Sequence, residues 1–342
     1  MMKRLLKATL AAAISTGLAA APAMAAESTL QKVKDLGKLS CGVNTGIAGF
    51  GAPDDKGNWS GLDVDVCKAV AAAVFKDGSL VKYVPLTAKE RFTALQSGEI
   101  DLLSRNTTWT MSRDTSAGLT FTGITYFDGQ GFLVNKELGV KSAKELSDAS
   151  ICVQTGTTTE LNVADYFRQN GMNYKPVVFE KLPETIAAYN AGRCDVFTSD
   201  ASQLYSVRLT LGNPDNHIVL PEVISKEPLG PAVRQGDPQW ANIVRWVFFA
   251  LVNAEELGIS SKNLDEMKES ANPEVRRLLG LEGEFGKGIG LDADWAYQAI
   301  KAVGNYGEMF ARNVGADSRL KISRGQNALW RDGGLQYAPP IR

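Results

Sequence analysis

An arginine and several hydroxyls stand close together in residues 104–115, which read SRNTTWTMSRDT. Arg113 follows Thr107 and Thr108 in this stretch, where an ordinary exposed segment carries acids or lysines. A guanidinium presents a planar fork of N–H donors that matches a carboxylate with two hydrogen bonds, and a lysine cannot reproduce this geometry. The stretch therefore predicts a binding site for a small carboxylate. The alternative is that Arg113 is a solvated helix residue paired with Asp114.

A second set of polar residues lies in two later stretches. Residues 155–160 read TGTTTE and open a predicted helix, so their free N–H groups form an anion site, unless Glu160 merely caps them. Asp200 ends the stretch 194–200, and its carboxylate suits an ammonium group, unless it only caps the next helix. An α-amino acid carries a carboxylate and an ammonium group on one carbon. The stretches together therefore predict a pocket that holds this zwitterion.

The elements that position these residues alternate between strands and helices. Apolar runs predict strands at 39–43, 81–85 and 100–103, with a helix at 62–75 and another that ends at Gly98. Strand–helix–strand alternation at this spacing predicts a parallel sheet flanked by helices. Ligands bind such sheets beyond the carboxyl ends of the strands, so the opening stretch is predicted to lie at the binding crevice.

The same alternation begins again in the second half of the chain. Strands are predicted at 151–154, 177–179 and 194–200, with helices between them. The segment SGEIDLLSRNT also resembles AGRCDVFTSDA in its order of small, acidic and apolar residues. The chain is therefore predicted to be an α/β protein with two similar lobes.

Two extended stretches, 131–135 and 230–234, are predicted to connect the lobes and to form a two-strand hinge. Two crossings place the second lobe at 132–234, inserted within a first lobe that consists of 26–131 and 235–342. The tail is predicted to be mostly helical, with amphipathic runs at 240–256, 293–312 and 319–331.

The first 25 residues resemble a secretory signal peptide. Lys3, Arg4 and Lys7 form a basic start, an apolar run follows, and 23–25 read AMA, so cleavage is expected after Ala25. The alternative, a membrane anchor, needs an apolar run of about 20 residues, and this run is shorter. No cysteine lies near the cleavage site to carry a lipid. The mature protein is therefore predicted to be periplasmic.

The four cysteines, Cys41, Cys67, Cys152 and Cys194, lack C-x-x-C spacing and are accompanied by a single histidine. No metal site is predicted from them. An even number of cysteines in an oxidising compartment favours disulfides. Three connectivities are possible, of which the sequential one would link cysteines within each half, and free thiols remain an alternative.

Charge and motifs exclude several classes of function. The formal net charge is −1, whereas nucleic-acid binding favours a basic surface. The chain has no G-x-S-x-G, no P-loop and no G-x-G-x-x-G after a predicted strand. No catalytic residues, cofactor or nucleic-acid partner are therefore predicted.

Over roughly 35–255 the chain resembles the periplasmic solute-binding proteins of polar amino-acid ABC transporters, bacterial extracellular solute-binding family 3. The motifs that carry the resemblance are GLDVDV at 61–66, ALQSGEID at 94–101, NTTWT at 106–110 with Arg113, and VQTGTT at 153–158. The chain is most similar to the general L-amino-acid binders. The resemblance implies a type II periplasmic-binding-protein fold, in which two doubly wound lobes close about a two-strand hinge. It also implies a monomer that delivers L-amino acids, polar or acidic and of broad range, to an inner-membrane permease.

The resemblance implies roles at both ends of the ligand. Arg113 would clamp the α-carboxylate, together with the amides of Thr108 and of Thr157 or Thr158. The α-ammonium group would be held by the Thr108 hydroxyl, the Asn106 carbonyl and Asp200.

Two further positions concern the ligand's side chain. Members of the family that select acidic ligands resemble this chain around 89–92, so Arg91 is expected to meet the side chain. Asn44 corresponds to a position in the first strand that tunes specificity. The chain departs from the family at Asn106, where many members have glycine, and in the helices beyond about 255.

Two rival functions remain open at the level of sequence. One is a periplasmic enzyme on the same scaffold, similar to cyclohexadienyl dehydratase, for which Glu160 and Asp200 are the available acids or bases. The other is a sensor module that presents an amino acid to a membrane receptor.

Overall fold

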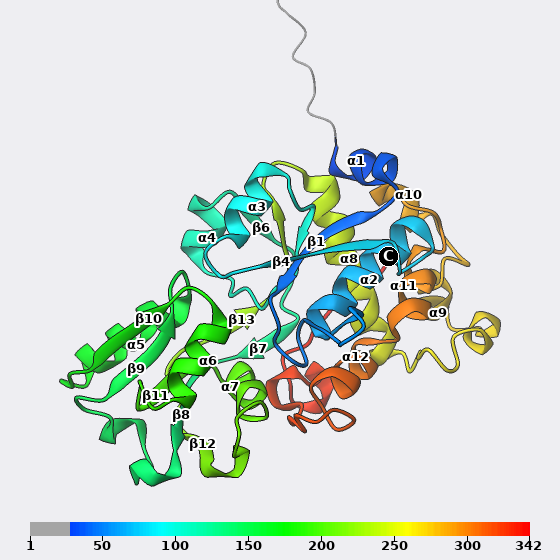
Figure 1. Ribbon diagram of the computed structural model, residues 1–342. Coiled ribbons are helices and arrows are strands. Elements are labelled where there is room, and N and C mark those ends of the chain that lie inside the picture. Colours follow the sequence, from blue (N-terminus) through cyan, green and yellow to red (C-terminus); the bar gives the residue numbers. More distant parts are fainter. Residues whose placement is uncertain (1–27) are drawn as a thin grey trace, which may run out of the picture.

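The computed structural model of the protein describes residues 28–342, and the predicted signal peptide lies outside these residues. Two separate five-stranded sheets divide the described chain into two lobes. In Figure 1 the second lobe is green, and the first lobe combines the blue and cyan segments with the yellow to red C-terminal part. The predicted α/β fold with two lobes is therefore confirmed.

The sheet of the first lobe has the strand order β4-β1-β5-β14-β6. β1 runs parallel to β4 and β5, whereas β14 is antiparallel to β5 and β6. Its strands are β1 (Leu39–Asn44), β4 (Val81–Leu86), β5 (Leu102–Leu103), β6 (Leu119–Phe121) and β14 (Ala232–Arg234), and its helices include α2 (Leu62–Phe75), α3 (Arg91–Ser97) and α4 (Met111–Ser116).

Both faces of this sheet are covered. Leu102 belongs to the buried cluster that includes α2, whereas Leu103 belongs to a second cluster that includes α3. Successive residues of a strand point to opposite faces, so the two neighbours anchor helices on opposite sides. This is why the strands are apolar runs rather than alternating sequences.

The sheet of the second lobe repeats the arrangement with the order β10-β9-β11-β8-β12. β9 is parallel to β10 and β11, and β8 is antiparallel to β11 and β12. Its strands are β8 (Gln130–Asn135), β9 (Ser150–Gln154), β10 (Lys175–Phe179), β11 (Val196–Asp200) and β12 (His217–Val219), and its helices include α5 (Thr158–Gln169), α6 (Leu182–Asn190) and α7 (Ala201–Arg208).

The strands that connect the lobes are not those predicted. β7 (Tyr126–Asp128) and β13 (Glu227–Leu229) pair as an antiparallel two-stranded sheet between the lobes (Figure 1). The stretch 131–135 instead lies in β8, and most of 230–234 lies in β14. Their apolar residues are buried inside the two large sheets, whereas the true connecting strands carry charged residues and are less conspicuous in the sequence.

The C-terminal part packs on the first lobe. Its helices are α8 (Pro238–Glu256), α9 (Pro273–Leu278), α10 (Phe285–Ile289), α11 (Trp295–Val303) and α12 (Tyr306–Asn313). α8, α11 and α12 all contact α2. The carboxylate of Asp65 in α2 accepts hydrogen bonds from Arg312 Nη2 and Asn313 Nδ2 of α12, each at 2.6 Å. The tail therefore returns to the first lobe.

The tail departs from its predicted helices in two places. The run at 293–312 is two helices, because Gly304 between them has a φ of 74° that breaks the helix. The helix predicted at 319–331 is wrong: this segment contains only the 3₁₀ turns Gly325–Asn327 and Trp330–Asp332. Gly325, with a φ of 47°, interrupts the run that the amphipathic pattern suggested.

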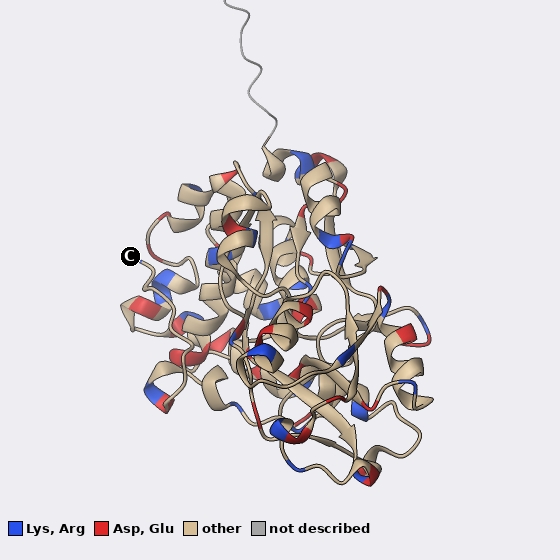
Figure 2. Cartoon of the chain, turned by 90° about the vertical axis from the view of Figure 1, so that its left-hand side faces the viewer, with Lys and Arg blue, Asp and Glu red and all other residues tan. Residues whose placement is uncertain are grey.

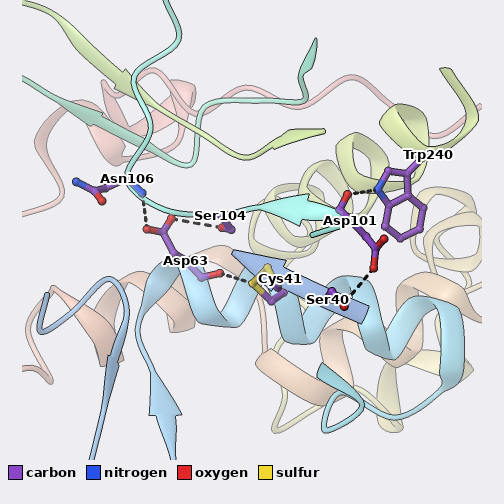
Figure 3. Close-up of a disulfide and its surroundings, with 8 residues drawn as sticks. Ser40, Cys41, Asp63, Asp101, Ser104, Asn106 and Trp240 are labelled. Carbon is purple, nitrogen blue, oxygen red and sulfur yellow. Dashed lines mark hydrogen bonds between the residues drawn. A yellow bond between two sulfur atoms is a disulfide. The ribbon is translucent and has the colours of Figure 1, made fainter. Parts of the chain in front are cut away.

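The cysteines form the sequential pair of disulfides, Cys41–Cys67 and Cys152–Cys194. The first joins β1 to α2, and the second joins β9 to the segment before β11. Figure 3 shows Cys41 between Asp63 and Ser40. Each disulfide therefore links elements within one lobe, and neither joins the two lobes.

In the view of Figure 2, acidic and basic residues are interspersed over both lobes. Within residues 28–342, no helix combines the length and the apolar character that crossing a membrane requires.

We expect the Cys152–Cys194 disulfide to stabilise the second lobe. Its removal in a Cys152→Ala/Cys194→Ala variant should lower the free energy of unfolding by about 2–4 kcal/mol, because the unfolded chain regains the conformational entropy that the closed loop had removed. Urea unfolding followed by circular dichroism measures the change. A midpoint equal to that of the oxidised wild type would contradict this expectation, and reduced wild type is the control.

Candidate functional site

A small cavity lies between the lobes, at the carboxyl ends of the parallel strands. Its volume is about 20 Å³. The first lobe contributes Ala88, Arg91, Arg105, Asn106 and Thr108, and the second lobe contributes Gln154, Thr157, Thr158, Thr159, Ser199, Asp200 and Gln203. These residues lie at the carboxyl ends of β9 and β11, in the loops after β4, β5 and β9, and in the first turns of α3, α5 and α7. Sheets of this kind bind ligands at this edge.

The two lobes touch each other around this cavity. Asn106 Nδ2 lies 3.5 Å from Gln203 Oε1 of the second lobe. Thr108 Oγ1 lies 3.3 Å from Thr158 Oγ1. The structure therefore shows the lobes closed on each other.

The loop after β5 is held by Asp63 at the start of α2. Asp63 Oδ2 accepts a hydrogen bond from the backbone N–H of Asn106 at 2.7 Å, and its Oδ1 accepts one from Ser104 (Figure 3). Asn106 has a φ of 29°, in the region that asparagine tolerates better than most residues and that glycine adopts freely. Asn44 Nδ2 donates to Asn106 Oδ1 at 3.0 Å, so Asn44 contacts a lining residue without lining the cavity itself.

Asp63 is buried beside arginines. Burial raises its pKa to about 6, while the N–H of Asn106 and the charge of Arg105 oppose the rise. The carboxylate of Asp63 thus holds the loop by hydrogen bonds, although its burial disfavours the ionised form.

Arg113 is buried, with 8% of its surface exposed. Its Nη1 donates to the carbonyl of Thr108 at 2.9 Å, and its guanidinium lies 5.2 Å from the centre of the Phe92 ring. The interpretation of Arg113 as a solvated helix residue is therefore wrong. Its guanidinium lies behind Thr108 rather than among the residues that line the cavity as the lobes are closed.

Arg91 and Arg105 line the cavity directly. Arg105 Nε donates to the carbonyl of Leu86 at 2.9 Å, and Arg91 Nη1 approaches Thr107 Oγ1 at 3.3 Å. Within the described part of the chain, Nε of Arg91 has no hydrogen-bond partner. Burial lowers the pKa of Arg105 to about 10, so this side chain is still cationic at neutral pH.

Asp200 faces these arginines from the end of β11. Burial, and then the carboxylates of Asp128 and Glu227, raise its pKa well above the ordinary value. Asp200 occupies the N-cap position of α7, but its side chain makes no capping hydrogen bond. The capping alternative therefore does not account for this carboxylate, which lines the cavity.

The start of α5 supplies hydroxyls to the same cavity. Thr157 Oγ1 accepts from the backbone N–H of Glu160 at 3.2 Å, and Glu160 Oε2 accepts from the N–H of Gly156 at 3.1 Å. Thr157 is thus the N-cap of α5, and the Glu160 carboxylate is engaged by the residue that precedes this cap. Thr158 Oγ1 donates to Glu227 Oε2 at 2.8 Å.

The structure brings most of the predicted site residues together. Arg91, Asn106, Thr108, Thr157, Thr158 and Asp200 line the cavity, and Asn44 and Arg113 lie in contact with lining residues. Their roles in binding stay predictions. The sequence analysis missed Arg105, Gln154 and Gln203, although Arg105 stands in the same stretch as Arg113 and meets the same criterion for an anion site. Among residues 28–342, no group of three or more His, Cys, Asp or Glu is arranged to hold a metal ion.

Comparisons with known proteins agree on one family. The sequence profile of the Bacterial extracellular solute-binding proteins, family 3, matches residues 39–264. The general L-amino acid-binding periplasmic protein AapJ of Rhizobium johnstonii is 63% identical over 344 residues, with 100% of both chains covered. The glutamate/glutamine/aspartate/asparagine-binding protein BztA of Rhodobacter capsulatus is 59% identical, covering 96% of this chain and 98% of that one.

A solved structure shows the same fold over nearly the whole chain. It is an ABC transporter/periplasmic binding protein from Brucella ovis with glutathione bound. The match has a TM-score of 0.91 and 62% identity, and covers 92% of this chain and 100% of that one.

The electrostatic interaction of Asp63 with Arg105 in the first lobe leads to a prediction that needs no ligand. An Arg105→Met variant should raise the pKa of Asp63 above about 6, because the neighbouring cation that favours the carboxylate is lost. The pKa is measured by NMR titration of ¹³C-labelled aspartate carboxyls. Arg245→Met in α8 is the control and should leave the titration unchanged.

The same variant should change how stability depends on pH. The folded pKa of Asp63 lies above the value of about 3.9 expected for the unfolded chain, so stability is lost as pH rises through the folded pKa. In Arg105→Met this loss should extend to higher pH. An unchanged titration of Asp63 would show that the two side chains are not coupled.

Proposed function

Because the chain belongs to family 3 of the bacterial extracellular solute-binding proteins, we propose that it captures L-amino acids between its lobes and delivers them to an ABC transporter permease. The observation that carries the proposal is a cavity between two charged walls. Buried arginines line it from the first lobe, and the carboxylate of Asp200, which does not cap α7, lines it from the second. Such facing charges suit a zwitterion, whose two ends require opposite partners. The relatives described above are named as binding proteins, and this chain is likewise a binding protein rather than an enzyme.

The α-carbon of the ligand would lie between Thr108 and Asp200. Arg113 and the N–H groups at Thr108 and Thr158 would bind the α-carboxylate. Asp200, the Thr108 hydroxyl and the Asn106 carbonyl would accept hydrogen bonds from the α-ammonium group. This arrangement requires the Arg113 guanidinium to reach past Thr108 to the bound ligand, because it does not line the cavity in this structure.

The side chain of the ligand would then point toward Arg91 and Arg105. Two guanidiniums at this end favour a second carboxylate, as in glutamate and aspartate. Gln154 and Gln203 line the same cavity, and their amides both donate and accept, so glutamine and asparagine also find partners. The ligands that BztA is named for have these four side chains.

The glutathione bound by the Brucella ovis protein is consistent with the same site. Its γ-glutamyl end carries an α-carboxylate and an α-ammonium group on one carbon, and the peptide continues from the side chain. For this chain, such a ligand would have to extend from the Arg91 end of the cavity.

Binding must be accompanied by movement of the lobes. A cavity of about 20 Å³ is close to the volume that one water molecule requires, so an amino acid enters only when the lobes separate. A ligand that contacts both walls then favours the closed state over the open one. The protein would act as a periplasmic monomer, with a membrane permease as partner.

The enzyme on the same scaffold is the less supported alternative. Its chemistry would need a free acid or base at the cavity, and the Glu160 carboxylate is engaged by the residue that precedes the N-cap of α5. Asp200 alone remains, and its position opposite the arginines suits an ammonium group.

Replacement of Arg113 should weaken amino-acid binding. Arg113→Met removes the charged partner of the α-carboxylate, and we expect a loss of about 2–5 kcal/mol in binding free energy for glutamate and for glutamine alike. Isothermal titration calorimetry measures it, with Arg245→Met as control and circular dichroism as a check on folding. Arg113→Lys should also bind weakly, because it keeps the charge but not the fork. Wild-type affinity in Arg113→Met would refute the assigned role.

Affinity should also depend on pH through Asp200. The raised pKa means that part of the ligand-free protein carries a protonated Asp200, whereas an ammonium group favours the carboxylate. Affinity for glutamate should therefore rise with pH above the range in which an ordinary aspartate titrates, and binding should release protons. Burial also raises the pKa of Asp128, to about 6, so the comparison with Asp200→Asn is needed to assign the effect. This variant should bind weakly with little pH dependence; an equal slope in both proteins would assign the effect to other groups.

A further inference from the structure

Glu227 in the connecting strand β13 bonds to both lobes without lining the cavity. We propose that Glu227 is a positioning residue, which turns the hydroxyls of Thr108 and Thr158 into acceptors for the ligand's ammonium group and ties the closed lobes together. The inference rests on the proposed function, because it concerns the same ligand.

The carboxylate of Glu227 is buried, with 1% of the residue exposed, and four donors satisfy it. Its Oε2 accepts from Thr108 Oγ1 at 2.6 Å and from Thr158 Oγ1 at 2.8 Å. Its Oε1 accepts from Asn162 Nδ2 at 2.7 Å and from Ser225 Oγ at 2.6 Å. Such a set of donors compensates a buried carboxylate for its lost hydration.

These bonds fix the direction of the two threonine hydroxyls. A hydroxyl has one hydrogen, and a carboxylate can only accept, so both hydrogens point at Glu227. Thr108 and Thr158 both line the cavity, and toward it their hydroxyl oxygens present only lone pairs, which accept hydrogen bonds. A ligand atom that meets these oxygens must donate a hydrogen bond. An ammonium group does so, and a keto or carboxylate oxygen does not.

The same bonds join three parts of the molecule. Thr108 belongs to the first lobe and forms a β-bridge with Leu229 of β13. Thr158 and Asn162 belong to α5 in the second lobe. Opening that moves α5 away from Thr108 must therefore break hydrogen bonds to Glu227 on at least one side. Loss of the carboxylate should accordingly favour the open form as well as free the hydroxyls.

The experiment compares glutamate with 2-oxoglutarate, which has a keto oxygen in place of the ammonium group. In Glu227→Met the hydroxyls can rotate and donate to that oxygen. The ratio of the affinities for glutamate and 2-oxoglutarate, measured by calorimetry, should therefore fall at least about tenfold, the range expected for hydrogen bonds that involve a charged group. Glu227→Gln should keep most of the ratio, because one amide oxygen can still accept from both threonines.

Glu222→Met is the matched control. Glu222 lies in the same segment of chain and accepts hydrogen bonds from Ser142 Oγ and the N–H of Ala143, all within the second lobe. Its replacement should lower the melting temperature and leave the ratio unchanged. An unchanged ratio in Glu227→Met, or an equal fall in Glu222→Met, would overturn the proposal.

Two further measurements separate the possible failures. If Glu227→Met does not fold, Thr158→Val removes one oriented hydroxyl, and a ratio equal to that of the wild type would then decide against the proposal.

Small-angle scattering of the ligand-free proteins tests the tie between the lobes, and Glu227→Met should have the larger radius of gyration. Equal radii of gyration for wild type and Glu227→Met would refute the tie between the lobes alone. If wild type binds no amino acid, the proposed function is wrong, and the ligand-orienting role of Glu227 is wrong with it.

Discussion

The structure depends on keeping opposite charges out of water on the two sides of one cleft. Arg91 and Arg105 are buried on one wall, and Asp200 is buried on the other. Desolvation disfavours each of these ions by itself, as the lowered pKa values of the arginines and the raised pKa of Asp200 show. Each charge is tolerated because hydrogen bonds and opposite charges lie close by. Under the proposed function, a ligand that carries both charges would add to this compensation and so favour the closed form.

The two α/β sheets are the means of placing these charges. Parallel strands end side by side, so the loop after β5 and the carboxyl end of β11 bring Asn106 and Asp200 to the same crevice although they are far apart in sequence. Asp63 shows how the first of these loops is fixed, because its carboxylate holds the backbone of Asn106 in a left-handed conformation. The disulfides Cys41–Cys67 and Cys152–Cys194 stiffen each wall separately. Neither disulfide joins the lobes, which are linked by the paired strands β7 and β13.

Much of this was predictable from the sequence, because the signals are local. Buried parallel strands are continuous apolar runs, and polar residues directly after them mark the site, as for Thr108 and Asp200. The connecting strands were misplaced because β7 and β13 are short and carry Asp128 and Glu227, whereas the apolar strands β8 and β14 next to them give the stronger pattern. Glu227 itself has no local signal, since its partners Thr108 and Thr158 are distant in sequence. The helix expected at 319–331 failed because amphipathic spacing does not register the backbone break at Gly325.

The C-terminal segment beyond the family profile, which ends at residue 264, bears on the same connection between the lobes. Asn327 Oδ1 accepts from the N–H of Phe127 at 2.7 Å, and its Nδ2 donates to the Phe127 carbonyl at 3.1 Å. Tyr306 Oη donates to the carbonyl of Thr125 at 2.9 Å. Backbone groups beside and within β7 are thus paired with the tail rather than with water. Because the tail also packs on α2, the first-lobe end of the connecting strand is fixed to that lobe. We therefore expect any bending between the lobes to fall in the part of β7 and β13 nearer the second lobe, where Asp128 and Glu227 lie.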